Sequence, residues 1–249
     1  MMLRYTLSAL AVFAAIPATA QSSLGVTGIE LRAGADDSQG SPVFGALTFD
    51  AAITEYHGIQ GRAMLRDNDT GTEGRLDGHL YMVPREGQKY GFFGFLSDFD
   101  GRSATYGGVG AEGLFALGDD TALELRAGLG IADQDSLDFL FAEAGLYHDL
   151  SESVTVSVST TLTELDEAAF STISHDLRLG LEVHPQGQPV GFFADVSRDG
   201  FSGDNIASGE TTFRAGITVE FGTMRSGGPE TRPFSSPQPL RPLTRRNLF

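Results

Sequence analysis

Charged residues of opposite sign stand two positions apart at several places along this chain. Four of these pairs are Glu30 with Arg32, Arg75 with Asp77, Glu124 with Arg126, and Asp176 with Arg178. Residues two positions apart point to the same side of a β-strand, so each pair would present both signs of charge to one face. Such a face suits a narrow, weakly cation-preferring water channel, or an internal ion-pair network that fills a barrel and leaves it a scaffold.

Other charged residues fall at positions that the same alternation places inside. A charge that faced lipid near the middle of a membrane would cost about 2–4 kcal/mol for Arg or Lys, so we expect these side chains to point inward. The predicted lining consists of Glu30, Arg32, Asp50, Arg62, Arg75, Asp77, His79, Glu112, Glu124, Arg126, Asp176, Arg178, Glu182 and Arg214.

One cluster of residues has the composition of a hydrolase site. His175 precedes Asp176, and Ser171 and Ser174 lie nearby, so His175 could act as the base for a serine nucleophile on a lipid or peptide. The alternative is a histidine in a polar rim. No flanking motif supports catalysis, so we expect no enzyme and assign no catalytic residue.

Metal and cofactor sites have little support in the sequence. The chain has no cysteine, which excludes disulfides, thiolate ligands and a cysteine nucleophile. Residues 67–71 resemble the start of a calcium-binding loop, but Gly78 stands where that loop needs a bidentate Glu. We therefore expect no cofactor and no resident metal, although acidic loops could bridge the divalent cations that hold lipopolysaccharide.

The elements that position these residues are strands. Twelve segments alternate apolar and polar residues, and most are close to the ~9–11 residues of a tilted strand that crosses a membrane. They predict an all-β, closed, antiparallel transmembrane barrel of about twelve strands, with ten or fourteen as the alternatives. The segments are 24–33, 43–54, 57–66, 75–83, 90–97, 105–117, 121–131, 137–148, 153–163, 171–183, 189–197 and 210–221.

Two of these segments do not fit a simple apolar and polar alternation. In 137–148, Glu143 should point inward, which also sends Phe139 and Phe141 inward. The segment 90–96 is apolar on both faces, so its orientation stays undecided.

The connections between the segments divide into a long and a short set. The odd connections, such as 35–42, 67–73, 164–170 and 198–209, are long, and the even ones are tight turns. Outer-membrane barrels show the same asymmetry, with the long loops outside the cell and the short turns in the periplasm. A soluble β-sandwich gives no reason for connections to sort in this way.

The last segment carries a more specific pattern. Arg214, Gly216, Val219 and Phe221 fit the order polar, any, Gly, any, any, apolar, any, apolar. This octet resembles the terminal sorting signal of Gram-negative outer-membrane β-barrels. The resemblance implies insertion by the barrel-assembly machinery and contact with outer-membrane lipid and lipopolysaccharide.

The first twenty residues predict export. They contain an early charge at Arg4, an apolar run from Leu7 to Ile16, and the small residues Ala18 and Ala20. This is the organisation of a signal peptide, and the run is far shorter than the ~20 apolar residues of a membrane-spanning helix. We expect residues 1–20 to be removed after Ala20, and residues 21–221 to form the barrel.

The tail, residues 222–249, differs in composition from the barrel. It holds five of the ten prolines and five arginines, in a chain whose net charge is −16. Such a segment cannot form a strand or bury a core, so we expect a disordered periplasmic extension that could contact a periplasmic partner. The acidic balance elsewhere argues against nucleic-acid binding.

Taken together, the patterns favour a porin-like, passive channel for small solutes in the cell outer membrane. The alternative is a structural or surface-interaction barrel that acts through its acidic extracellular loops. A lipid- or peptide-hydrolysing barrel enzyme is the third hypothesis.

Overall fold

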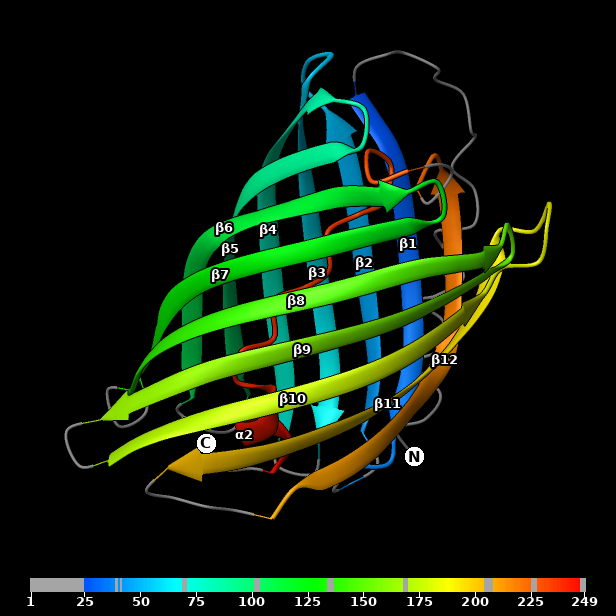
Figure 1. Ribbon diagram of the computed structural model, residues 1–249. Coiled ribbons are helices and arrows are strands. Elements are labelled where there is room, and N and C mark those ends of the chain that lie inside the picture. Colours follow the sequence, from blue (N-terminus) through cyan, green and yellow to red (C-terminus); the bar gives the residue numbers. More distant parts are fainter. Residues whose placement is uncertain are drawn as a thin grey trace.

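The alternating segments form twelve β-strands that close into a barrel, shown in Figure 1. The computed structural model describes residues 25–246 apart from 39, 41, 69–70, 101–103, 134–136, 168–169, 204–207 and 225–227. The predicted signal peptide and its cleavage site lie outside the described residues. The strands are β1 (Gly25–Asp36), β2 (Val43–Ala52), β3 (His57–Asn68), β4 (Gly71–Arg85), β5 (Gln88–Phe99), β6 (Thr105–Gly118), β7 (Thr121–Ala132), β8 (Leu137–Ser151), β9 (Val154–Glu167), β10 (Phe170–Val183), β11 (Val190–Gly203) and β12 (Glu210–Gly222).

Every strand pairs antiparallel with its neighbours in sequence, and the first strand pairs with the last. At the closure Ile29 of β1 lies opposite Phe221 of β12, and Ala33 lies opposite Ile217. Closure satisfies the backbone hydrogen-bonding groups that an open sheet would leave at its two edges. The predicted closed antiparallel barrel of twelve strands is therefore confirmed. Within the described ranges no helix is long and apolar enough to span a membrane.

Strand β7 illustrates how the sequence divides the two faces of the barrel wall. Leu125, Leu129 and Ile131 are 43%, 58% and 66% exposed, whereas Glu124 and Arg126 are each 4% exposed. The apolar residues face outward and the charged residues face inward, which is the reverse of a soluble protein. This arrangement requires an apolar medium around the barrel and a polar interior.

The structure settles the orientation of β5, which the sequence left undecided. Phe93 and Phe95 point inward and are buried, whereas Phe92 and Leu96 are 71% and 54% exposed on the outside. The inward rings pack against those that β8 contributes, with Phe93 and Phe141 ring centroids 6.0 Å apart. The inward orientation of Phe139 and Phe141, expected because of Glu143, is confirmed.

Glycines on the intervening strands make room for these rings. A Cβ atom at Gly110 of β6 would collide with the ring of Phe93, and one at Gly130 of β7 would collide with the ring of Phe139. The aromatic cluster therefore lies flat on the inner wall of β6 and β7. It fills part of the lumen that we expected to be polar.

Two of the predicted long connections are hairpins of extended strands. Strands β3 and β4 stay paired as far as Asn68 opposite Gly71, and β9 and β10 stay paired as far as Glu167 opposite Phe170. The expected loops 67–73 and 164–170 were wrong in length, because the hydrogen-bond ladder continues through polar residues beyond the apolar band. The asymmetry between the two barrel ends is accordingly weaker than the sequence predicted.

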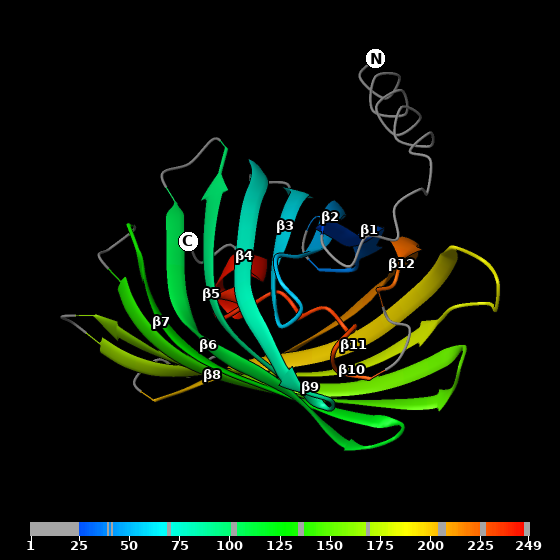
Figure 2. The ribbon, with the colours of Figure 1, turned by 90° about the horizontal axis from the view of Figure 1, so that it is seen from above.

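The tail departs most from expectation. Instead of forming a disordered extension, residues 228–246 run through the barrel interior and end in the short helix α2 (Arg241–Arg245). In Figure 1 this segment, coloured orange to red, passes from the top of the barrel to α2 near the bottom, and Figure 2 shows it enclosed by the strands. Phe234, Leu240 and Arg245 are all buried. The prediction of disorder failed because composition shows only that the tail forms no core of its own, whereas its side chains are buried against the barrel wall.

Candidate functional site

The charged lining predicted from the sequence lies on the inner face of the barrel. The side chains that we expected inside make ion pairs, hydrogen bonds or cavity contacts there, including Arg32 with Glu182 at 2.9 Å and Arg214 with Asp195 at 2.7 Å. Two of the four predicted same-strand pairs are direct ion pairs, Arg75 with Asp77 at 2.8 Å and Arg126 with Glu124 at 2.8 Å. In the other two, Arg32 pairs with Glu182 and Asp176 with tail arginines.

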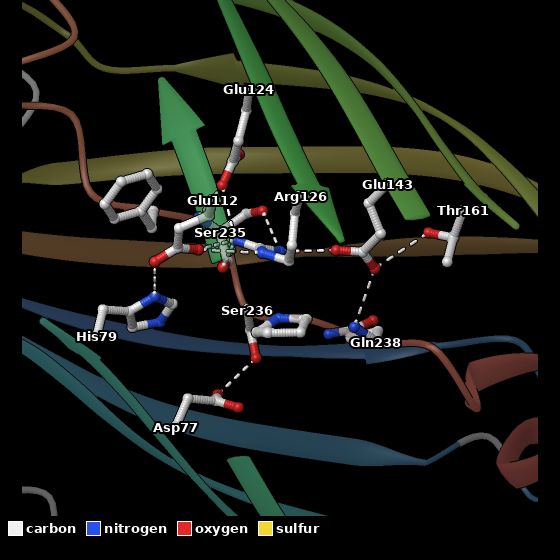
Figure 3. A network of polar contacts seen from close by, with 12 residues as sticks. Asp77, His79, Glu112, Glu124, Arg126, Glu143, Thr161, Ser235, Ser236 and Gln238 are labelled. Atoms are coloured by element: carbon white, nitrogen blue, oxygen red, sulfur yellow. Dashed lines mark hydrogen bonds and ion pairs between the residues drawn. The ribbon is translucent and has the colours of Figure 1, made fainter. Parts of the chain in front are cut away.

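Arg126 of β7 is the centre of the most extensive network in the lumen, shown in Figure 3. Its guanidinium donates to Glu112 on β6 at 2.9 Å, to Glu124 on β7 at 2.8 Å and to Glu143 on β8 at 2.7 Å. Three carboxylates on adjacent strands thus converge on one cation. Arg126 is itself 4% exposed, so the network is shielded from solvent and its members depend on one another.

The tail joins this network through its backbone. The carbonyl oxygen of Ser235 accepts from Arg126 at 2.6 Å, and the Ser235 amide donates to Glu124 at 3.0 Å. The amide of Gln238 donates to Glu143 at 3.1 Å. Carboxylates and a guanidinium on the wall therefore bind backbone groups of the proline-rich tail, which cannot pair as a β-strand.

Phe234 is the apolar anchor of the tail. Its ring stacks on His79 with centroids 5.7 Å apart, and its edge meets Tyr81. Gln60 holds the backbone of the same residue twice, because its side-chain amide donates to the Phe234 carbonyl and accepts from the Phe234 amide, both at 2.8 Å. His79 in turn lies 2.6 Å from Glu112, which links the anchor to the Arg126 network.

Three further contacts fix the middle of the tail. The hydroxyl of Ser236 donates to Asp77 at 2.5 Å, Arg75 donates to the carbonyl of Pro237, and Thr163 donates to the carbonyl of Pro239 at 2.9 Å. These contacts reach from β4 to β9 across the lumen. We call residues 233–240 the anchored segment.

At the end of the barrel with the short turns, the tail is held by wall residues of both signs. Lys89 donates to the carbonyl of Arg232 at 3.1 Å, and the Arg232 side chain pairs with Asp149 at 3.2 Å. Glu230 accepts from the amide of Gly87 in the turn between β4 and β5. The tail therefore enters the barrel at the same end at which β12 finishes.

At the opposite end, three tail arginines meet an acidic part of the wall. Arg245 lies 3.7 Å from Asp176 and 3.7 Å from Asp199, and Arg241 lies 3.8 Å from Asp176 and 3.9 Å from Asp195. Arg246 pairs with Asp199 and lies 3.9 Å from Glu210. We call residues 241–246 the arginine segment, and Asp176, Asp195 and Asp199 the acidic mouth.

A residual cavity of about 180 Å³ runs beside the anchored segment. Its wall comes mainly from β7 to β12 and β1, and it includes Arg32, Arg62, Arg178 and Arg214. At ~10–15 Å³ for each water centre, this space holds roughly a dozen waters. With the tail in place, the lumen is therefore a wet but narrow space.

The residues considered for catalysis are not brought together. His175 is exposed on the outer face of β10, whereas its neighbours Ser174 and Asp176 are buried on the inner face. Ser171 also faces outward, and among the described contacts none joins it to His175. In the described part of the chain, no group of three or more His, Asp or Glu residues could hold a metal ion. Part of the calcium-loop-like stretch, Asp69 and Thr70, lies outside the described residues.

The sorting-signal residues occupy both faces of β12. Arg214 points inward to Asp195, and Phe221 is 46% exposed on the outside beside the closure with β1. Gly216 lies opposite Gly34, and Val219 lies opposite Leu31. Recognition of this strand by the assembly machinery remains a prediction.

Sequence reasoning missed the tail as part of the site. Gln60, Thr163, Asp195 and Asp199 were also absent from the predicted lining, although all lie at inward positions of their strands. One signal was present: the arginines concentrated in the tail complement the acid excess of the barrel. Complementary charge alone does not show that the tail binds inside the barrel.

Comparison with known proteins supports the fold. No protein-family model matches the sequence, and no curated protein matches it. Among solved structures, the NanC porin aligns with a TM-score of 0.59 at 9% identity, covering 77% of this chain and 98% of that chain. The COG4313 outer membrane channel from Pseudomonas putida F1 aligns with a TM-score of 0.56 at 10% identity, covering 82% and 97%.

A third similar structure is the KdgM porin in complex with disordered oligogalacturonate. It aligns with a TM-score of 0.54 at 12% identity, covering 78% of this chain and 99% of that chain. At these identities the likeness establishes the fold, that of a porin-like outer-membrane β-barrel. The chemistry of the lumen has to be argued from this chain's own residues.

Proposed function

We propose that this protein is an outer-membrane channel for small solutes, closed in this structure by its own C-terminal tail. The observation that carries the proposal is the course of the tail, which runs from one end of the lumen to the other and ends in α2. A lumen that accommodates a peptide segment along its length is wide enough for small solutes once the peptide leaves. Its polar wall would then be wetted.

The contacts of the tail are compatible with release. Because the chain has no cysteine, no disulfide bond cross-links the tail to the wall. Wall groups such as Gln60, Asp77 and Thr163 can exchange their bonds to the tail for bonds to water. Of the described tail residues, Met224, Phe234 and Leu240 bury large apolar side chains, and Pro237, Pro239 and Pro242 are fully buried. The closed state therefore combines this apolar burial with polar contacts, and a wetted lumen replaces the polar part.

The same proposal includes the location and processing of the protein. Residues 1–20 direct export and are removed after Ala20. Arg214, Gly216, Val219 and Phe221 then direct insertion by the barrel-assembly machinery. The outward apolar band then meets lipid, and the start of β1 and the end of β12 face the periplasm. In that orientation the acidic mouth opens toward lipopolysaccharide and the cell exterior. Protease accessibility of the connection 204–209 on intact cells tests this orientation.

A reversible lock tests the channel function directly. Asp77 and Ser236 touch through short side chains, so Asp77→Cys with Ser236→Cys places two thiols where a disulfide can form. In planar bilayers, the reduced protein is expected to show ion-conducting openings, which oxidation abolishes and reductant restores. Each single cysteine variant is the control, since it perturbs the same contact without a lock.

The channel proposal is contradicted if folded wild-type protein and the reduced double variant both fail to conduct at voltages that open other porins. The barrel would then be a filled scaffold, and its acidic connections would become the functional surface. Heat-modifiable gel mobility confirms folding in each sample before the recordings.

A further inference from the structure

The acidic mouth differs from the rest of the lumen in where its counter-charges come from. In the Arg126 network, wall carboxylates are paired by a wall cation. At the mouth, the ion pairs of Asp176 and Asp199 among the described residues are all with tail arginines. When the tail leaves, these two carboxylates lose their cationic partners, whereas Asp195 keeps Arg214.

These carboxylates are also incompletely satisfied while the tail is present. Asp176, Asp195 and Asp199 are 5%, 5% and 2% exposed, and each has one carboxylate oxygen without a hydrogen-bond partner. The guanidinium groups of Arg241 and Arg245 stand 3.7–3.9 Å away, beyond hydrogen-bonding distance. Buried anionic oxygens that lack a donor are expensive, so the mouth has unused capacity for a better-fitting cation.

Neighbouring wall groups are arranged to receive such a cation. Ser197, on the inner face of β11 between Asp195 and Asp199, accepts from Arg245 at 2.9 Å and from Arg241 at 3.3 Å. The ring of Phe201 lies 5.0 Å from the guanidinium carbon of Arg246, which is cation–π range. Carboxylates, a hydroxyl and an aromatic face together form a site suited to ammonium or guanidinium groups on a flexible chain.

We infer that the acidic mouth is a binding site for organic cations that carry several amino or guanidino groups, and that the arginine segment occupies it as a built-in competitor. The inference rests on the proposed channel, because the site becomes free only when the tail withdraws from the mouth. A polyamine or a short cationic peptide would take the place of Arg241 and Arg245. Such a cation would be both the ligand at the mouth and the solute that favours opening.

The first test uses spermine, a linear polyamine, and the full-length protein in detergent micelles. Thr244 is 6% exposed between the arginines, so Thr244→Cys adds a protected thiol to a chain that has none. We expect spermine to raise the rate of thiol labelling at least tenfold over sodium chloride of the same ionic strength. Equal rates would overturn the inference, and so would an equal effect of Mg²⁺ at matched ionic strength.

Charge-neutral variants localise the effect. In Asp176→Asn with Asp199→Asn, labelling at position 244 is expected to be fast without spermine and to change less than twofold when it is added. The matched control is Glu55→Gln with Asp119→Asn, which removes two exposed carboxylates at the end with the short turns and should respond as the parent does. If the control also loses the response, spermine acts on overall charge and the inference fails.

A direct binding measurement covers the case in which the aspartate variant does not fold. Arg241→Gln with Arg245→Gln and Arg246→Gln leaves every wall carboxylate in place and removes the competing guanidinium groups. Calorimetric titration should show spermine binding at least tenfold tighter than to the parent. Unchanged or weaker binding would overturn the inference.

Current and labelling report on the two proposals separately. Conductance that is insensitive to spermine would contradict the proposed cation site and support the proposed channel. Spermine-dependent labelling without any conductance would contradict the channel and support the cation site.

Discussion

The two parts of the tail are held in the lumen by different physics. The anchored segment makes directional hydrogen bonds of about the ideal length, such as the two at 2.8 Å between Gln60 and Phe234, and it inserts an aromatic ring. The arginine segment has fewer such bonds, chiefly to Ser197 and from Arg246 to Asp199. Arg241 and Arg245 reach their carboxylates only by charge, at 3.7–3.9 Å. Directional hydrogen bonds fix the position of a segment, whereas charge attraction at longer range only keeps the segment near the opposite charge. We therefore expect the arginine segment to leave first and the anchored segment to decide whether the channel opens fully.

The largest effect is expected from Arg126→Ala. The substitution leaves Glu112, Glu124 and Glu143 in the lumen without their common cation, and breaking one buried ion pair costs about 3–5 kcal/mol. The urea midpoint of the folded barrel in liposomes should fall clearly. Arg198→Ala is the control, because Arg198 is exposed on the outside of β11. Equal stability of the two variants would show that the network is solvated and unimportant.

Phe234→Ala should come next, and it acts on the tail more than on the barrel. Removing a buried Phe side chain costs about 3 kcal/mol or more, which corresponds to roughly a 100-fold shift in the docking equilibrium of the tail. Thiol labelling of Ser235→Cys should accelerate by that order. The urea midpoint of the barrel should change little, since the strands keep all of their ladder bonds. A large fall in that midpoint would mean that the tail is part of the folding core.

Gln60→Leu sharpens the comparison within the anchored segment. Leucine approximates the size of glutamine but leaves the amide and carbonyl of Phe234 without partners, at a cost of about 1–3 kcal/mol. Labelling at Ser235→Cys should rise about tenfold or more, and labelling at Thr244→Cys should rise less. A larger rise at Thr244→Cys would mean that the two segments dock as one unit.

Salt should have the smallest effect and the most selective one. Raising ionic strength from 0.1 M to 1 M shortens the screening length from about 10 Å to about 3 Å. Labelling at Thr244→Cys should increase several-fold, whereas labelling at Ser235→Cys should stay within a factor of about two. Equal acceleration at both positions would break the comparison between the two segments.

The wall of this barrel was largely predictable, because each strand repeats a two-residue rule. The outward leucines and inward charges of β7 and β10 follow from that rule and from the cost of a charge in lipid. The rule is silent where both faces are apolar, as in β5, whose inner rings are selected by packing against Phe139 and Phe141. It also cannot say where a polar strand stops, which is why the hairpins at 67–73 and 164–170 were expected to be loops.

The tail lay beyond local rules altogether. Its prolines exclude a strand, and from composition alone the remaining choices were disorder or docking. Docking is decided by contacts between residues far apart in sequence, such as Gln60 with Phe234 or Arg126 with Ser235. No spacing within the tail encodes those partners.

The pairing of β1 with β12 has a consequence for how the molecule is made. The barrel cannot close until β12 has been synthesised and has paired with β1, yet the tail that fills the lumen follows β12 in the chain. Either the barrel closes around a tail that is already folded back on the nascent sheet, or the tail enters the lumen from the periplasmic side after closure. In the second order of events, the newly inserted protein passes through an open stage, and the arginine segment must travel the full length of the lumen before it reaches the aspartates that receive it.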